Sequence, residues 1–500
     1  MFTLFRERQL RNFTIFYYNA KFCVLEINIL LLLCYILFVN FQNINLSFFI
    51  SYLNFILMKK INRRDFIKSS GLVAAGIGMS GFAMPTVLAN GAPGEKIIVA
   101  VAGVNGRGDH MAKLLAGLPN CEVGYICDVD ERAMNKTAGN VAAIQSRKPN
   151  MEKDFRKALE DKGVDAFLIA MPDHWHAPGA IIGCSMGKHV YVEKPISHNP
   201  NEGELLVKAA RKYNRIVQMG SQRRSGTGLF QMIADIRSGI IGNVYMARTW
   251  YTNRRGPLYL KDGSVPSWLD YDLWQGPAPR MPYRDELIHY NWHWRWHWGT
   301  GEALNNGTHE VDVARWGLGV EFPIRVTSAG GRYAYKDDWE TPDSQVISLE
   351  FPENKMIVWE GRSCNSLKSE GSDRGVMFYG ENGSICNPGG NSYIVYDKSG
   401  KVVKEFKDNQ DSKDTTNTVS AGANLDKMHV ENFLDCIRSG KMPNADCEIG
   451  HRSTLLVQLG NIAWRMQQDL DIDSSNGHIL TPGAQQYWSR EYEKGWEPKI

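Results

Sequence analysis

The chain has 500 residues, with 57 Lys and Arg side chains against 54 Asp and Glu, and a formal net charge of +3. The first 92 residues hold nine of the basic and three of the acidic side chains, which leaves 48 basic and 51 acidic residues beyond them. This near balance excludes the strongly basic surface of a nucleic-acid-binding protein.

Residues 1–57 are rich in Phe, Ile, Leu, Asn and Tyr and contain no Gly, Pro, Asp, His or Trp. Such bias is typical of translated AT-rich upstream DNA, so we expect residues 1–57 to be a spurious extension before the start codon of Met58. The alternative is a membrane span around residues 27–41. Its uninterrupted apolar core, residues 29–39, is shorter than the roughly 20 residues that a bilayer requires.

Residues 58–92 have the features of a twin-arginine export signal. The paired Arg63 and Arg64 are followed by Phe66 and Lys68, and a weakly apolar, Gly- and Ala-rich run covers residues 71–84. Small residues near Ala89 and Ala92 suit signal cleavage. We therefore expect a periplasmic mature protein that crosses the membrane already folded and is not stably inserted in it.

Residues 93–222 alternate strand and helix patterns, which predicts a doubly wound parallel sheet of the Rossmann type. The expected strands are residues 96–102, 122–127, 164–170, 189–192 and 216–220. The expected helices are residues 109–117, 154–162, 178–186 and 201–213.

Residues 223–480 are expected to form an α+β domain with a large, mostly antiparallel sheet that binds substrate and supports homo-oligomers. Its strands are predicted at residues 326–334, 343–351, 355–362, 375–380, 383–387, 393–396 and 402–406, joined by turn signals such as Glu381-Asn382-Gly383. Helices are expected at residues 427–439 and 450–469. Residues 481–500 form an aromatic tail.

The turn after the first strand reads Gly103-Val104-Asn105-Gly106-Arg107-Gly108. The turn has glycine at both ends, and Asn105 and Gly106 tolerate unusual backbone conformations. Its backbone can therefore come close to a pyrophosphate bound at the N-terminus of the following helix. Asp128 ends the second strand, where its carboxylate suits ribose hydroxyls and repels a 2′-phosphate. The sequence predicts NAD rather than NADP, a preference that the nearby Arg132 would soften.

Two further loops follow neighbouring strands at the same edge of this sheet. One reads Pro172-Asp173-His174-Trp175-His176, and the other Glu193-Lys194-Pro195. Ligands bind beyond the carboxyl ends of strands in such sheets, so cofactor contacts are expected from Pro172, Asp173, His174, His176, Glu193, Lys194 and Arg107. A metal site in the first loop is disfavoured because no third ligand is evident.

These motifs, with Gly187-Lys188-His189-Val190 and Asn305-Asn306-Gly307-Thr308-His309-Glu310-Val311-Asp312, resemble the Gfo/Idh/MocA family, named after glucose-fructose oxidoreductase, inositol dehydrogenase and a rhizopine-catabolism protein. The resemblance spans residues 93–500. It implies that Lys194 lies near the nicotinamide and the reacting hydroxyl, that Pro195 is cis, and that His309 faces the same carbon. Lys194 and His309 are thus the expected catalytic pair.

One position departs from the family pattern. Many members have Asp where this chain has Asn305, and an amide takes no proton at neutral pH. Proton transfer then falls to Lys194 or His309, while Asn305 and Asp312 are expected to contact the substrate. Burial and like charge should lower the pKa of Lys194, which suits a proton relay.

The run Tyr290-Asn291-Trp292-His293-Trp294-Arg295-Trp296-His297-Trp298 alternates aromatic and polar residues. An extended segment would place the tryptophans on one face, and Trp292, His293 and Trp296 would suit a sugar ring. The alternative is that the indoles are packing core. A metal site formed by His289, His293 and His297 is disfavoured. The seven cysteines after residue 92 include no Cys-x-x-Cys pair and are expected to be buried thiols.

The leading function is NAD-dependent hydride transfer from a secondary hydroxyl of a sugar, polyol or glycoside. The first alternative is an NAD-dependent glycosidase resembling glycoside hydrolase family 109, which oxidises C3 transiently and eliminates the aglycone. In those enzymes the second cofactor loop has Pro-Trp where this chain has Pro172-Asp173, which favours a dehydrogenase. The other alternative, a non-catalytic sugar or nucleotide sensor, is disfavoured by the presence of Lys194 and His309.

Overall fold

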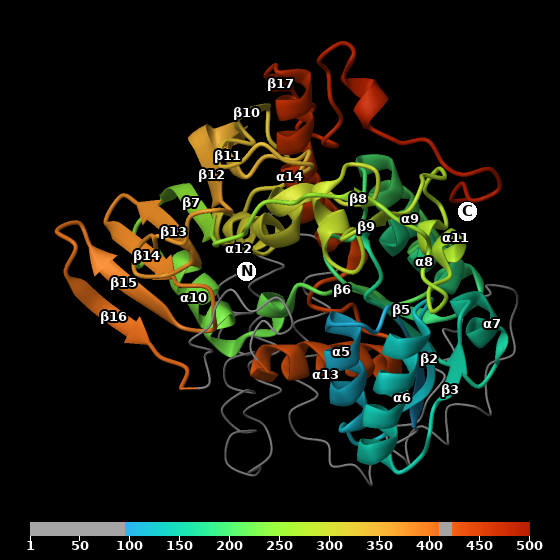
Figure 1. Ribbon diagram of the computed structural model, residues 1–500. Coiled ribbons are helices and arrows are strands. Elements are labelled where there is room, and N and C mark those ends of the chain that lie inside the picture. The colour runs from blue at the N-terminus through green and yellow to red at the C-terminus, as the bar shows by residue number, and fades with distance from the viewer. Residues whose placement is uncertain (1–95, 410–422) are drawn as a thin grey trace, which may run out of the picture. The chain divides into compact units, whose positions relative to one another are not determined.

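The computed structural model describes residues 96–409 and 423–500, which form two sheets and their helices (Figure 1). The predicted upstream extension, 1–57, and the predicted signal, 58–92, lie outside the described residues. Within the described ranges, no helix combines the length and apolar character needed to cross a bilayer.

The first sheet is parallel, with strand order β3-β2-β1-β4-β5-β6. Its elements in chain order are β1 (Ile97–Ala102), α5 (Arg107–Ala116), β2 (Cys121–Cys127), α6 (Glu131–Gln145), β3 (Asn150–Glu152), α7 (Phe155–Glu160), β4 (Ala166–Ile169), α8 (Asp173–Ser185), β5 (His189–Val192), α9 (Pro200–Lys212) and β6 (Val217–Met219). The order reverses between β1 and β4, where ligands bind in such sheets. The predicted Rossmann fold is confirmed.

The second sheet has the order β16-β15-β14-β13-β7-β12-β11-β10-β17. Its strands are β7 (Val244–Thr252), β10 (Arg325–Gly331), β11 (Ser344–Phe351), β12 (Lys355–Arg362), β13 (Arg374–Gly380), β14 (Gly383–Asn387), β15 (Tyr393–Asp397), β16 (Val402–Phe406) and β17 (Leu470–Asp471). All neighbours are antiparallel except β7 and β12. The predicted mostly antiparallel sheet is confirmed, although its central strand β7 was not predicted. In the Rossmann half, helix α6 was not predicted either.

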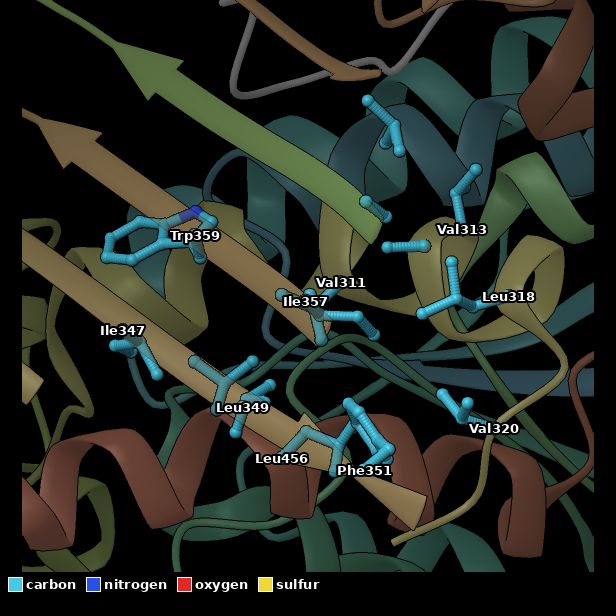
Figure 2. Close-up of a cluster of buried hydrophobic side chains, with 14 of the residues drawn as sticks. Val311, Val313, Leu318, Val320, Ile347, Leu349, Phe351, Ile357, Trp359 and Leu456 are labelled. Carbon is cyan, nitrogen blue, oxygen red and sulfur yellow. The ribbon is translucent and has the colours of Figure 1, made fainter. Parts of the chain in front are cut away.

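Helices of the second half cover one face of this sheet. They are α10 (Thr227–Arg237), α12 (Thr308–Leu318) and α14 (Cys447–Met466). Alternate residues of β11 and β12 are fully buried against them. Figure 2 shows this cluster, which includes Ile347, Leu349, Phe351, Ile357, Trp359, Val311 and Leu456. The core fixes α12, which carries His309, against the sheet.

Shorter elements connect these parts. They are 3₁₀ turns η2 (Gln222–Ser225), η3 (Asn291–Trp294), η5 (Pro352–Asn354) and η6 (Ala484–Tyr487), the π-helical turn η4 (Ala303–Gly307), the helix α11 (Tyr271–Gln275) and the small ribbon of β8 (Lys261–Asp262) and β9 (Arg284–Asp285). The π turn leads directly into α12. Such turns often occur at functional sites.

Two late segments pack on the Rossmann half. Helix α13 (Ala423–Ser439) lies beside α5 although the two are far apart in the sequence (Figure 1), and it adds Val430 and Phe433 to the core beneath β1 and β2. In the tail, the Trp496 ring meets the Trp175 ring edge-on at 5.1 Å, and Arg490 donates to the His174 carbonyl at 2.7 Å. The tail therefore supports the first turn of α8.

Candidate active site

A cleft of about 290 Å³ lies at the carboxyl ends of the Rossmann strands and is closed by residues of η3, η4 and α12. It gathers residues that are far apart in the chain. The predicted residues that line it are Gly103, Asn105, Gly106, Arg107, Asp128, Pro172, Asp173, His176, Glu193, Lys194, Trp292, His293, Asn305 and His309.

The glycine turn leaves room for a ligand above the start of α5. Gly103 has a φ of 80°, and a Cβ there would lie 2.5 Å from the Met171 nitrogen. A Cβ at Gly106 would meet no atom within 4 Å, and no side chain caps the helix. The open backbone at a helix N-terminus fits a pyrophosphate.

Two substitutions in this turn should have different effects. Gly103→Ala should lower the unfolding free energy by about 1–3 kcal/mol, because its φ and the nearby backbone both oppose a side chain. Gly106→Ala should leave stability within about 0.5 kcal/mol yet weaken NAD binding, because its methyl group would point into the cleft. Urea unfolding and NAD titration check both, and equal stability of the two variants would contradict this geometry.

Asp128 follows β2, where it is largely buried. Its oxygens accept from the Val104 nitrogen at 2.6 Å and the Asp130 nitrogen at 2.9 Å, and it lines the cleft. Arg132 does not approach this cleft: its guanidinium lies 3.3 Å from the centre of the Trp268 ring and pairs with Asp130. The expected softening by Arg132 therefore finds no support, and the carboxylate favours NAD.

Lys194 is largely buried at the end of β5. Its Nζ donates to the Asn305 carbonyl at 2.6 Å and to Asn305 Oδ1 at 3.1 Å. Desolvation lowers the pKa of Lys194 despite the opposing charges of Glu193 and Asp173. Asn305 thus holds the lysine, and because it also lines the cleft its expected sugar contact stays a prediction. The Lys194–Pro195 peptide is cis, as the resemblance implies.

His309 lies in the first turn of α12 and lines the same cleft. Burial, with the positive charges of Arg374 and Lys194, holds the pKa of His309 well below its ordinary value. No group in the described ranges hydrogen-bonds its ring. The imidazole therefore lines the cleft with no hydrogen-bond partner among residues 96–409 and 423–500, and its lowered pKa favours the neutral form.

Buried ion pairs surround these two residues. Glu310 pairs with Arg223 and Arg374, each at 2.8 Å, and Arg107 pairs with Glu193 at 2.8 Å. Arg107 also binds Asp426 of α13. Several lining residues were not predicted, among them Arg374, Gln222, Trp274 and Asn306. Asn306 lies inside the quoted motif, whereas no local pattern marks Arg374 at the start of β13.

Four predicted site residues lie outside the cleft. Asp312 is fully buried and paired with Arg224 at 2.8 Å. Burial alone would raise the pKa of Asp312, but the charges of Arg224 and Arg315 and the hydrogen bonds from Arg224 and Ser453 together lower it to about 2. His174 points away and contacts the Trp274 carbonyl at 3.0 Å. Trp296 stacks near Trp464, and Gly108 packs against the Gly103 carbonyl. The structure therefore does not bring these four residues to the cleft lining, because a sequence motif gives the order of residues along the chain and not the direction in which each side chain points.

The aromatic run from Tyr290 to Trp298 is not extended. Residues 291–294 form a 3₁₀ turn, so His293 stacks on Trp292 with ring centroids 3.6 Å apart, and both line the cleft. Trp294 and Trp298 are core residues. The predicted separation of aromatic and polar faces was wrong. Within the described ranges, no cluster of three metal-ligating side chains occurs.

The sequence comparison with family models shows the family. Residues 97–221 match the Gfo/Idh/MocA description "Oxidoreductase family, NAD-binding Rossmann fold", and residues 233–463 match its "C-terminal alpha/beta domain". A glycosyl hydrolase family 109 protein of Shewanella pealeana is 27% identical over 231 residues, which are 42% of this chain and 51% of that protein. The chain spans about half the length of the curated relatives it matches.

Solved structures share the fold. An oxidoreductase domain protein of Kribbella flavida has 17% identity and a TM-score of 0.59, covering 76% of this chain and all of that one. Levoglucosan dehydrogenase, solved with NADH and levoglucosan, has 16% identity and a TM-score of 0.58, covering 75% and 99%. The chain belongs to the Gfo/Idh/MocA family of oxidoreductases and carries both its NAD-binding Rossmann domain and its C-terminal domain.

Proposed function

We propose that this enzyme oxidises a secondary hydroxyl of a sugar, polyol or glycoside, with Lys194 and His309 as the catalytic pair. The observation that carries the proposal is that these two basic side chains line the same cleft as the glycine turn and Asp128. The aromatic rings of Trp292 and His293, which line the cleft, suit a sugar ring. Levoglucosan dehydrogenase, a carbohydrate enzyme, shares the fold.

The chemistry divides between the cofactor and the protein. NAD, when bound, supplies the acceptor for the hydride that leaves the substrate carbon with its electron pair. The hydroxyl proton needs a base, and a carbonyl forms as the O–H and C–H bonds break. The Lys194 nitrogen donates two hydrogen bonds to Asn305. Its third substituent position stays available for a hydrogen bond with the substrate hydroxyl. Neutral His309 offers a second acceptor.

A panel of sugars and polyols, scanned for NADH fluorescence with NAD and with NADP, tests the proposal. We expect NADH to accumulate with at least one neutral sugar, and NADP to support slower turnover. Absence of reduced nucleotide with every compound, in protein that binds NAD, would contradict the proposed dehydrogenase.

A glycosidase of the family 109 type is the second candidate, because the curated relatives include glycosyl hydrolase family 109 proteins. In such an enzyme the substrate would give a hydride to the cofactor, and the product would receive it back within one turnover. Release of nitrophenol from nitrophenyl glycosides without added NAD, and with no NADH left over, would favour this candidate over the dehydrogenase.

We further propose export through the twin-arginine route and assembly as a homo-oligomer. Arg63 and Arg64 support the first, and exposed apolar side chains on the second sheet, Tyr245 and Val346, support the second. Export of folded protein would carry NAD along, so we expect nucleotide in protein purified under native conditions. Cell fractionation, nucleotide analysis and light scattering test these points, and nucleotide-free cytosolic monomer would contradict them.

A further inference from the structure

His176 lies in the first turn of α8, on the wall of the cleft, and is 2% exposed. Its Nδ1 is 2.6 Å from the Pro195 carbonyl oxygen, and its Nε2 is 2.7 Å from the Met171 carbonyl oxygen. Met171 follows β4, and Pro195 follows Lys194 at the end of β5. The ring therefore bridges the two loops that frame the catalytic lysine.

Both partners of this ring are acceptors only. A neutral imidazole carries one N–H and one bare nitrogen, so it satisfies one carbonyl and repels the other. Only an imidazolium donates from both nitrogens. Rotating the His176 ring by half a turn about its Cβ–Cγ bond would place ring carbons, instead of nitrogens, beside both carbonyl oxygens, so neither hydrogen bond could form. Among the twelve histidines, all within the described ranges, His176 alone has a backbone carbonyl at each nitrogen.

The surroundings supply the counter-charge that a buried cation needs. Asp173, three residues earlier on α8, is 2% exposed, and its Oδ2 accepts from Thr300 Oγ1 at 2.5 Å. Burial raises the pKa of Asp173, and the charges of His176 and Lys194 oppose that rise. His293 of η3 also interacts electrostatically with His176, and Lys194 at the end of β5 lines the same cleft. The helix N-terminus disfavours a cation, which Asp173 offsets.

We propose that His176 is held as an imidazolium by its two carbonyl acceptors, with the Asp173 carboxyl group nearby on α8, and that its two hydrogen bonds make it the positioning residue for Lys194. The protonation state follows from the hydrogen bonds alone. The consequence for catalysis rests on the proposed function, since it concerns the placement of the Lys194 nitrogen against the substrate hydroxyl.

Nitrogen-15 NMR of the histidine-labelled full-length protein tests the protonation state without any activity. At about pH 8, above the ordinary histidine range, both His176 nitrogens should show the shifts of protonated ring nitrogens. His189 is the internal control, because its Nδ1 accepts from the Ile216 nitrogen and burial lowers the pKa of His189 to about 4. A neutral tautomer at His176 would overturn the proposal.

His176→Gln tests the positioning role. It should lower kcat by about 10- to 100-fold, because displacement of a catalytic group by about 1 Å has effects of that size, and leave KM for the sugar within about threefold. His297→Gln is the matched control, since His297 meets one carbonyl, that of Pro279, outside the cleft. Unchanged kcat in His176→Gln would overturn the positioning role. Lack of turnover in the unsubstituted protein would instead refute the proposed function, and the NMR result would still stand.

Discussion

Replacing Lys194 with methionine is expected to lower kcat by about a thousandfold, because general acid–base groups contribute roughly 10²–10⁴ to rates. Methionine keeps the apolar stem but removes the nitrogen that Asn305 holds. NAD affinity should change by less than about threefold, since the glycine turn and Asp128 are untouched. Steady-state kinetics with the best sugar and titration of NAD measure the two effects.

Lys188→Met is the matched control for this experiment. Its Nζ also donates to two backbone oxygens, those of Asp161 at 2.7 Å and Val164 at 2.8 Å, but outside the cleft. That variant should lose stability and keep its kcat. Substantial turnover by Lys194→Met, or an equal loss in Lys188→Met, would remove the lysine from the proposed mechanism.

Glu310→Gln is expected to lower the unfolding free energy by about 3–5 kcal/mol, because it leaves two buried arginines without their charge partner. Glu310 is fully buried between Arg223 and Arg374. Burial alone would raise the pKa of Glu310, but the two arginines outweigh it and lower that pKa. Its contribution is therefore present above the ordinary glutamate range and is lost as pH falls below about 4. Urea unfolding near neutral and acidic pH checks both parts.

Asp469→Asn provides the comparison for Glu310→Gln. Asp469 pairs with Arg325 at 2.6 Å, but both side chains are about half exposed, at 54% and 48%. Loss of such a pair should cost less than about 1 kcal/mol. If Glu310→Gln lost as little unfolding free energy as Asp469→Asn, Arg223 and Arg374 would not depend on the Glu310 carboxylate for their stability.

The Rossmann half was predictable because its apolar strands and its turn residues are local signals. The five expected strands all appear, and β5 has the expected bounds. Strand β7 was missed because it lies at the centre of the second sheet, where Thr249, Trp250, Tyr251 and Thr252 are all buried and the usual alternation is lost. Thr249 keeps its hydroxyl satisfied by donating to the Val358 carbonyl.

Contacts between residues that lie far apart in the chain could not be predicted from local sequence patterns. The apolar spacing of Val430, Phe433, Leu434 and Ile437 indicates a buried helix face, but only the fold shows that it meets the Rossmann core. The same applies to Arg374, which reaches the cleft from β13. Asp312 was misplaced because it lies one turn from His309 on a face that meets Arg224 rather than the cleft.

The most direct test of the central claim is to follow deuterium from the carbinol carbon of a turned-over sugar in a single turnover of NAD-loaded protein. We predict that deuterium appears on the nicotinamide, that NADH accumulates with a ketone product, and that both are about a thousandfold slower with Lys194→Met. Sugar consumed without transfer of deuterium to the nucleotide would contradict hydride transfer at this cleft.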